Sequence, residues 1–409
     1  MSSSAAQCRS CGQGGLKEIL SLGRTPLANA LLQESDLAQP EATYPLDLAW
    51  CPHCALVQIT ETVSPEVLFR EYAYFSSFSE TMLRHAEELA GELRQRLKLN
   101  SDSLVIEAAS NDGYQLQYYQ RAGVNVLGIE PARNIAAVAR QRGIPTVAEF
   151  FGRECAQQLV AEGRRADVFH AHNVLAHVPD LNGFVAGIAT VLQPTGVAVI
   201  EAPYAKDLFD HVEFDTIYHE HLCYFSLTAL ERLFQRHGLQ IVDVRRVAIH
   251  GGSLQVHLAR TGQHTPTPAV AQLLAEEATW VTDDAFYRRF GERVEQLRAN
   301  LVSLLTQLKQ DDKRIAVYGA SAKGATLLNY CRIGSDLLDY VVDRSTVKQG
   351  RYTPGTHLRI HDPARLVEEM PDYVLLLTWN FADEILRQQA EYRRRGGRFI
   401  IPIPELKVA

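Results

Sequence analysis

The stretch LVIEAASNDGYQL, residues 104–116, decides how this chain folds. It joins an apolar β-type run to a turn of small and polar residues, and then to the start of a helical pattern. The ligand crevice of an open α/β sheet lies just beyond strand ends of this kind. The turn does not match G-x-G-x-x-G, the glycine motif that binds the pyrophosphate of a dinucleotide. We therefore expect a different cofactor at this turn, held by Glu107, Ser110, Asn111 and Gly113.

Outward from this turn, apolar β-type runs alternate with helical patterns, as is typical of parallel sheets with crossover helices. A helix is expected at about 80–98, and a long, charged helical stretch at 268–310 separates two such alternations. The expected strands lie in VNVLGIE (124–130), ADVFHAHNV (166–174), GVAVIEAP (196–203), RIAVYGAS (314–321), DYVVDRS (339–345), YVLLLTW (373–379) and RFIIPIP (398–404).

Two close cysteine pairs precede the first alternation. Cys8 and Cys11 form one C-x-x-C turn, and Cys51 and Cys54 form the other. Two such turns supply the four thiolates of a tetrahedral zinc site, and a full set leaves no position for a reactive water. We therefore expect a structural Zn²⁺, with two unrelated surface turns or a redox pair as the alternatives.

The chain is thus expected to be an α/β protein of three parts. Residues 1–75 form a small zinc-binding domain, residues 76–247 a central Rossmann-like domain, and residues 248–409 a helical connector with a second Rossmann-like domain. The 409 residues carry a formal net charge of −7, which gives no support to nucleic-acid binding. We find no apolar run long enough to span a membrane and no secretory signal in MSSSAAQC, so we expect a cytoplasmic protein.

The residues after the opening turn suggest the identity of the cofactor. The next strand ends in Glu130 and Pro131, and an acidic residue at this place is the usual partner of ribose hydroxyls. Phe150 and Phe151 come after a third short strand, where an adenine can pack, and Asn173 ends the strand after that. In this order the set indicates S-adenosylmethionine. The alternative is a generic α/β turn with a surface glutamate.

The segment FDTIYHEHLCYFS (214–226) crowds titratable side chains into one short stretch. It comes after the strand that ends at Tyr204, so it lies on the same sheet edge as the cofactor turn, as does His177. Three interpretations are open: a metal site, a set of structural hydrogen bonds, or an acid/base site. We favour the acid/base site. Its candidate residues in this segment are Tyr218, Glu220 and His221, and Tyr224 is a candidate for contact with the substrate.

Together these motifs resemble the sugar C-methyltransferases of antibiotic deoxysugar biosynthesis. The resemblance runs from about residue 8 to the C-terminus. It rests on the paired C-x-x-C, YAYFSSFS (72–79), EAASNDGYQL (107–116), GIEPA (128–132), HNVLAHVPD (172–180), FDTIYHEHLCYFS, IHGGS (249–253) and VYGASAKGATLLN (317–329). His172 is a local departure to which we assign no role.

The resemblance implies the three domains above and a sugar pocket lined by Tyr218, Glu220, His221 and His177, with His221 as the base. It also implies a tyrosine from YAYFSSFS, either Tyr72 or Tyr74. We expect methyl transfer to C3 of a dTDP-linked 4-keto-6-deoxysugar, because a hydrogen next to a ketone is acidic enough for a histidine to remove. The protein is expected to act as a monomer.

The remaining expectations concern substrate contacts and rival functions. Lys323, at a predicted helix start, either contacts the nucleotide diphosphate or stands in a turn that only packs helix on sheet. His250 and Ser253 are weaker candidates for phosphate contact. C5 methylation, sugar O- or N-methylation, and a non-enzymatic module that senses S-adenosylmethionine remain as alternatives.

Overall fold

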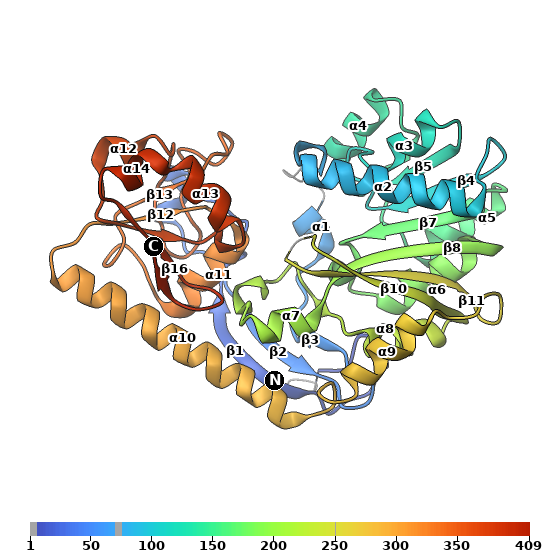
Figure 1. Ribbon diagram of the computed structural model, residues 1–409, viewed down its shortest axis with the longest axis horizontal. Helices are drawn as coiled ribbons and strands as arrows, with labels where there is room; N and C mark the ends of the chain where they lie inside the picture. The colour runs from blue at the N-terminus through green and yellow to red at the C-terminus, as the bar shows by residue number, and fades with distance from the viewer. Residues whose placement is uncertain (1–5, 70–75, 250) are drawn as a thin grey trace.

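The computed structural model describes residues 6–69, 76–249 and 251–409, and it shows the expected α/β architecture in three parts (Figure 1). The N-terminal part is a four-stranded antiparallel sheet of order β1-β2-β3-β9. Its fourth strand does not come from the N-terminal residues but from the segment at 214–226. The elements are β1 (Lys17–Thr25), η1 (Glu34–Ala38), β2 (Tyr44–Trp50), β3 (Val57–Ile59), α1 (Pro65–Phe69) and β9 (Cys223–Tyr224).

The central part is a seven-stranded sheet of order β10-β11-β8-β7-β4-β5-β6. The five strands from β8 to β6 are parallel, while β11 is antiparallel to both its neighbours. Parallel strands read as nearly continuous apolar runs because helices cover both faces. The strands are β4 (Leu104–Ala108), β5 (Asn125–Ile129), β6 (Thr146–Val147), β7 (Ala166–His172), β8 (Leu192–Pro203), β10 (Leu239–Val247) and β11 (Ser253–Arg260).

Helices flank this sheet, and the expected helix at 80–98 is α2 (Glu80–Leu97). Ser79 caps it by accepting a hydrogen bond from the Met82 amide, and its buried residues Met82, Ala86, Leu89 and Leu93 recur at helical spacing. The others are η2 (Ser76–Phe78), α3 (Leu116–Arg121), α4 (Arg133–Gln141), α5 (Arg153–Ala161), η3 (Leu175–His177), α6 (Leu181–Val191), α7 (Ala205–Asp210), η4 (Phe214–Thr216) and α8 (Leu227–Gln235).

Two expected boundaries differ from the structure. The sequence predicts a domain limit after residue 247, but β11 at 253–260 pairs with β8 along six residue pairs and belongs to the central sheet. The two glycines at 251 and 252 form the turn of a hairpin between β10 and β11. In the sequence this glycine pair resembles a boundary between domains. The helical stretch at 268–310 is two helices, α9 (Pro268–Glu277) and α10 (Asp284–Gln310).

The C-terminal part is a six-stranded sheet of order β14-β13-β12-β15-β16-β17, parallel except for β17. Its elements are β12 (Ile315–Tyr318), α11 (Ala322–Cys331), β13 (Val341–Val342), β14 (Ile360–His361), α12 (Arg365–Glu369), β15 (Tyr373–Leu376), η5 (Trp379–Phe381), α13 (Ala382–Gln388), α14 (Ala390–Arg394), β16 (Arg398–Ile401) and β17 (Lys407–Val408).

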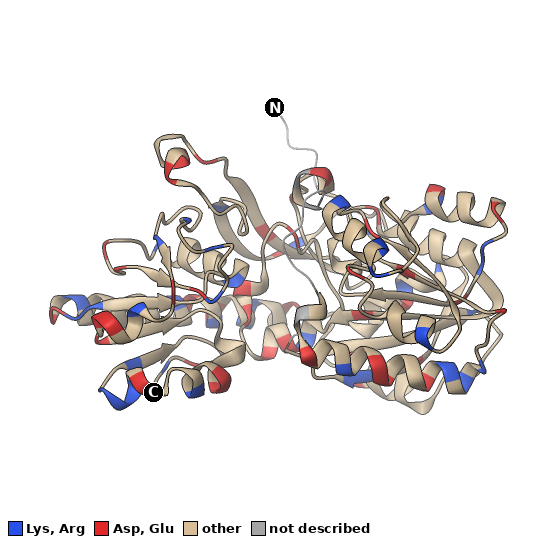
Figure 2. Cartoon of the chain, turned by 90° about the horizontal axis from the view of Figure 1, so that it is seen from above, with Lys and Arg blue, Asp and Glu red and all other residues tan. Residues whose placement is uncertain are grey.

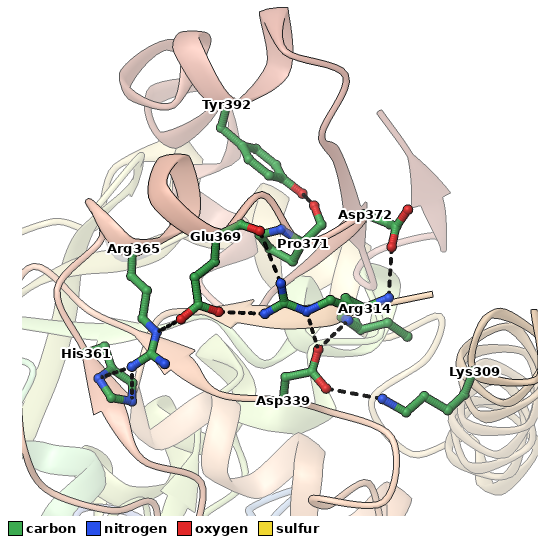
Figure 3. Close-up of polar contacts among 10 residues, drawn as sticks. Lys309, Arg314, Asp339, His361, Arg365, Glu369, Pro371, Asp372 and Tyr392 are labelled. Atoms are coloured by element: carbon green, nitrogen blue, oxygen red, sulfur yellow. Dashed lines mark hydrogen bonds and ion pairs between the residues drawn. The ribbon is translucent and has the colours of Figure 1, made fainter. Parts of the chain in front are cut away.

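Ion pairs occupy the amino-terminal edge of this sheet (Figure 3). Arg314, just before β12, donates through its backbone amide to Asp372 at 2.9 Å and through its guanidinium to the Glu369 carbonyl at 3.1 Å. Asp339 lies 3.1 Å from Lys309 near the end of α10 and 3.8 Å from Arg314. This network ties the helical connector to the sheet, at the edge opposite the carboxyl ends of the strands.

Figure 1 shows how the three parts are arranged. The central and C-terminal parts form two lobes above the N-terminal sheet, and α10 runs beneath the C-terminal lobe. Lys and Arg are interspersed with Asp and Glu over both lobes in Figure 2. Within the part of the chain that the structure describes, no helix is both long and apolar enough to cross a membrane.

Candidate active site

A cavity of about 810 Å³ lies at the carboxyl edge of the central sheet, and all three parts of the chain line it. Asn29 comes from the N-terminal part, and Lys323 and Phe381 come from the C-terminal lobe. The structure brings most of the predicted site residues together here: Asn111, Glu130, Pro131, Phe150, Phe151, Asn173, His177, Tyr218, Glu220, His221, Tyr224 and Lys323.

Some predicted residues lie elsewhere. Glu107, Ser110 and Gly113 stand behind the cavity wall rather than on it. Ser253 is fully buried, and its hydroxyl donates to the Ile249 carbonyl at 3.0 Å, so it does not line the cavity. Its role in phosphate contact stays a prediction without geometric support. Tyr72, Tyr74 and His250 lie outside the described residues.

The turn after β4 has an unusual backbone. Ala109, Asn111 and Gly113 have φ angles of 52°, 49° and 80°, and Asn173 after β7 has 54°. A left-handed conformation costs an L-residue such as alanine roughly 1–2 kcal/mol, so the surrounding structure must hold it in place. Strain of this kind is found at ligand sites, and here it borders the cavity at the ends of two neighbouring strands.

Glu130 supports this turn and faces the cavity. One carboxylate oxygen accepts the Asn111 amide at 2.9 Å and the other accepts the Ala132 amide at 2.8 Å. Burial raises the pKa of Glu130 to about 7, against the lowering effect of these two amides. Each oxygen keeps a second lone pair, so the ionised side chain can still accept hydrogen bonds from a ligand's hydroxyl groups.

Several polar atoms behind and on the wall have no hydrogen-bond partner among the described residues. They are both carboxylate oxygens of Glu107, the hydroxyl of Ser110 and the amide oxygen of Asn173. Burial, with the nearby Glu130 and Asp112 charges, raises the pKa of Glu107 well above its usual range. Buried polar groups are nearly always paired. Of these atoms, the amide oxygen of Asn173 belongs to a residue on the cavity wall, where it can accept a hydrogen bond from a bound S-adenosylmethionine.

Phe151 is held in position by other aromatic rings. Its ring lies 4.8 Å from that of Phe169 on β7 and 5.1 Å from that of Phe184 on α6, the latter edge to face. Such pairs add about 0.5–1.5 kcal/mol beyond area burial. With Phe150 it gives the cavity an apolar wall next to Glu130, as an adenosine requires.

The 214–226 segment places His221 on the cavity wall with both ring nitrogens engaged. Nδ1 lies 2.9 Å from the Thr216 carbonyl, and Nε2 lies 2.9 Å from the Tyr218 hydroxyl. A carbonyl only accepts, so Nδ1 carries the proton and Nε2 presents a lone pair. The Tyr218 ring is tilted by 33° against the imidazole, with the ring centroids 4.1 Å apart, and the His177 ring centroid lies 5.0 Å away. Tyr224 donates to the same Thr216 carbonyl at 3.3 Å.

Glu220 and His177 complete this cluster. Glu220 accepts the Asn29 amide at 2.6 Å, and burial raises its pKa although that hydrogen bond opposes the shift. His177 places Nδ1 2.6 Å from the Glu220 carbonyl, which assigns its proton to Nδ1 as well. His219, by contrast, is buried and bonds the Pro45 carbonyl at 3.1 Å, so it serves the N-terminal sheet.

A chain of buried polar side chains reaches the same wall from behind, and we call it the buried ionic chain: Tyr119, His170, His172, Glu201, His85 and Gln255. His172 lines the cavity and lies 2.9 Å from Glu201, which accepts from His85 at 2.6 Å and from Gln255 at 2.8 Å. Its histidine partners hold the pKa of Glu201 well below its usual range despite burial, and Glu201 in turn raises the pKa of His85.

The four paired cysteines form one compact cluster. The Sγ atoms of Cys8 and Cys54 are 3.4 Å apart, those of Cys11 and Cys51 are 3.5 Å apart, and all four lie within 4.8 Å of one another. Tetrahedral zinc with bonds of about 2.3 Å places its sulfur ligands roughly 3.8 Å apart. The predicted zinc site is thus confirmed in its ligands and fits a closed, structural ion.

Sequence reasoning missed several cavity residues. Asn29, Asp207 and Phe381 lie on the wall but stand in stretches without a motif. His172 stands beside the predicted Asn173, yet its link to Glu201 becomes visible only when β7 and β8 pair. No local signal in the sequence marks Asn29, Asp207 or Phe381 as site residues, and none marks the link of His172 to Glu201, because each depends on a contact between elements that are distant along the chain.

Comparison with known proteins gives matches along nearly the whole chain. Three family models match: a zinc binding domain at 8–69, a methyltransferase domain at 82–244, and a C-methyltransferase C-terminal domain at 248–404. The C-methyltransferase NovU of Streptomyces niveus is 38% identical over 404 residues, which is 98% of this chain and 96% of that protein.

Solved structures match less closely. Magnesium protoporphyrin IX methyltransferase from Synechocystis PCC 6803, with bound SAH, is 14% identical over 44% of this chain and 83% of that one, with a TM-score of 0.36. The CcbJ methyltransferase of Streptomyces caelestis is 15% identical over 43% of this chain and 89% of that one, with a TM-score of 0.34. Likeness this distant says nothing about the substrate of this chain.

Proposed function

Because the chain belongs to the family of S-adenosylmethionine-dependent sugar C-methyltransferases, we propose that it methylates C3 of a dTDP-linked 4-keto-6-deoxysugar through an enolate. The observation that carries this proposal is the pairing of His221 with Tyr218 on the wall of the cavity that Glu130 and Asn173 also line. A carbon acceptor needs a base, and a base next to the cofactor residues meets that need.

The cofactor residues would be Glu130, Phe151 and Asn173, with Asn111 at the turn. Bound there, S-adenosylmethionine supplies an electrophilic methyl group. The protein's task is then to generate the carbanion and hold it in line. His221 suits the task because the Thr216 carbonyl fixes its tautomer and leaves the Nε2 lone pair as the basic site.

Tyr218 serves both the resting base and the enolate. Its hydroxyl donates to Nε2 of the neutral imidazole in the present arrangement. With the keto-sugar bound, this hydroxyl turns from Nε2 to the C4 oxygen, which leaves the single Nε2 lone pair to take the proton from C3. The Tyr218 hydroxyl then donates to the enolate oxygen and stabilises it. The proton lost by the sugar and the charge gained by its oxygen therefore have defined partners.

His177 and Glu220 would hold the sugar itself. Neutral His177 carries its proton on Nδ1, so its Nε2 accepts a hydrogen bond from a sugar hydroxyl or amine. It donates to an enolate only as an imidazolium. Glu220 keeps one oxygen on Asn29 and has a second for a polar group of the sugar.

Lys323 is our candidate for the nucleotide diphosphate. It stands in the first turn of α11, on the cavity wall, where the helix terminus adds to its positive charge. Since one chain supplies every part of the cavity wall described above, we also propose that the protein acts as a monomer, which light scattering of the purified protein would test.

The test is hydrogen exchange at carbon. We expect the wild-type protein, with keto-sugar in heavy water and S-adenosylhomocysteine in place of the methyl donor, to exchange the hydrogen at C3. His221→Ala is expected to slow exchange and turnover by about 10²–10⁴-fold, the usual contribution of a general base. The matched control is His264→Ala, at an exposed histidine.

The same reaction separates the rival functions. Mass spectrometry of a panel of nucleotide keto-sugars shows which one gains a methyl group, and NMR of the product locates it. Hydrogen exchange and methylation at C5 would mean that the acceptor carbon is C5 instead of C3, with the same enolate mechanism. Methylation of oxygen or nitrogen without carbon exchange, or near-normal turnover by His221→Ala, would overturn the proposal.

A further inference from the structure

The C-terminal lobe reaches into the segment that carries the proposed base. Trp379 stands in η5, directly after β15, and its indole N–H donates to a carboxylate oxygen of Asp215 at 2.7 Å. Asp215 is fully buried in η4, 164 residues away along the chain. Its other carboxylate oxygen has no hydrogen-bond partner among the described residues. The indole thus provides the side-chain hydrogen bond that the structure gives this buried acid.

The peptide next to Asp215 orients the imidazole. Thr216, the following residue, offers the carbonyl that accepts from Nδ1 of His221 at 2.9 Å and from the Tyr224 hydroxyl at 3.3 Å. A shift of η4 therefore moves the group that fixes the tautomer of His221. The position of that carbonyl depends on what holds Asp215.

The rest of the environment ties η4 to the same lobe. Phe214 packs against Tyr330 of α11, with ring centroids 5.3 Å apart. Lys323 lies 4.6 Å above the Trp379 ring. Burial raises the pKa of Asp215, while Lys323 and then the indole N–H oppose that shift. The backbone of Asp215 and Thr216 adds smaller support from η4 itself, whereas the charge and the side-chain hydrogen bond that support the buried acid both come from the C-terminal lobe.

We propose that Trp379 is a positioning residue for this reaction: it holds Asp215, and through it the Thr216 carbonyl that keeps the ring proton of His221 on Nδ1 and makes Nε2 the basic nitrogen. This inference rests on the proposed role of His221 as the base. It assigns to the C-terminal lobe a part in proton removal, in addition to contact with the substrate.

Trp379→Phe removes the N–H and keeps a ring beneath Lys323. We expect kcat and the carbon exchange rate to fall together by about 10–100-fold, the range that a misplaced group produces. KM for both substrates should change little. Nitrogen-15 NMR of the histidines should show His221 wholly as the Nδ1–H tautomer in wild type and as a mixture in the variant. A purely structural role would leave that tautomer unchanged.

Asp215→Ala and the double variant complete the test. If both residues act through one hydrogen bond, the double variant loses no more than the larger single loss. Asp215→Asn keeps an amide oxygen that accepts from the indole, so this variant should retain hydrogen exchange at carbon. If Trp379→Phe does not fold, Asp215→Asn is compared with Asp215→Ala instead. Asp383→Ala removes an exposed carboxylate from the neighbouring helix α13 as a control.

Three results would overturn the inference: unchanged kcat in Trp379→Phe, additive losses in the double variant, or an unchanged His221 tautomer. His221→Ala is measured in the same series. If it retains turnover, the proposed base is wrong whatever Trp379 does. If it loses turnover while Trp379→Phe does not, the base stands and only the positioning role fails.

Discussion

Replacing Glu201 by glutamine should destabilise the central domain strongly and in a pH-dependent way. The side chain is fully buried on β8, accepts hydrogen bonds from His85 and Gln255, and lies 2.9 Å from His172. Hydrogen bonds to a charged group contribute about 1.5–3 kcal/mol each, against about 0.5–1.5 kcal/mol for neutral ones. Glutamine keeps the shape but loses roughly 1–1.5 kcal/mol at each of the two bonds, and its NH₂ group faces the Nδ1–H of His172.

The expected loss is therefore about 3–5 kcal/mol, as found when a buried ion pair is broken. For a domain of this size that lowers Tm by roughly 6–20 °C. The assay is urea or thermal unfolding of wild type, Glu201→Gln and the control Glu87→Gln, which removes an exposed carboxylate from the same helix as His85.

The pH dependence gives a sharper test. The pKa of Glu201 is lowered by its histidine partners. The carboxylate therefore contributes to the free energy of unfolding above about pH 4.3, and this contribution is lost as pH falls through its pKa in the folded protein. The pKa of His85 is raised by Glu201. Protonated His85 therefore contributes to the free energy of unfolding below about pH 6.5, and this contribution is lost as pH rises through its pKa in the folded protein. The difference between wild type and Glu201→Gln should be largest at about pH 5–6. A loss below about 1 kcal/mol, or one that is equal at about pH 5.5 and pH 8.5, would refute this account.

Three further changes have defined outcomes. Cys11→Ser, or a zinc chelator, should release one zinc per chain by atomic absorption and lower activity, because β9 joins the segment with the proposed base to the N-terminal sheet; Cys155→Ser should do neither. Wild type is expected to lose affinity for S-adenosylmethionine as pH falls through about 7, because Glu130 is then protonated. Glu130→Gln should weaken S-adenosylmethionine binding by about tenfold or more in calorimetry and abolish that pH dependence. Lys323→Met should raise KM for the nucleotide sugar about tenfold and leave KM for S-adenosylmethionine unchanged, whereas equal effects on both would contradict diphosphate contact.

The fold was readable from the sequence where one local pattern decided it. The strand and turn at 104–116, the helix at 80–98 and the four cysteines each carry their signal within a few residues, and the structure confirms them. The family relationship and the enzyme class were readable for the same reason, since the motifs are short and ordered.

The features that the sequence did not reveal depend on contacts across the chain. β11 looks like part of the next domain because the glycine turn before it resembles a boundary, and only its pairing with β8 assigns it to the central sheet. Glu201 and His85 are 116 residues apart, and Trp379 and Asp215 are 164 apart. Neither pair has a spacing that any local pattern could mark. Likewise, the burial of Ser253 is set by the hairpin and not by its neighbours in IHGGS.

The short strand β9 has a consequence for protein engineering. Because Cys223 and Tyr224 pair with Gln58 and Val57, the loop with the proposed base is built into the same sheet as the metal-bearing module. A chimaera that exchanges only the first 75 residues between two relatives would pair β3 of one protein with β9 of the other. To keep the native pairing, residues 214–226 must be exchanged as well. Recombination points for such hybrids should therefore be chosen so that β3 and β9 come from the same parent.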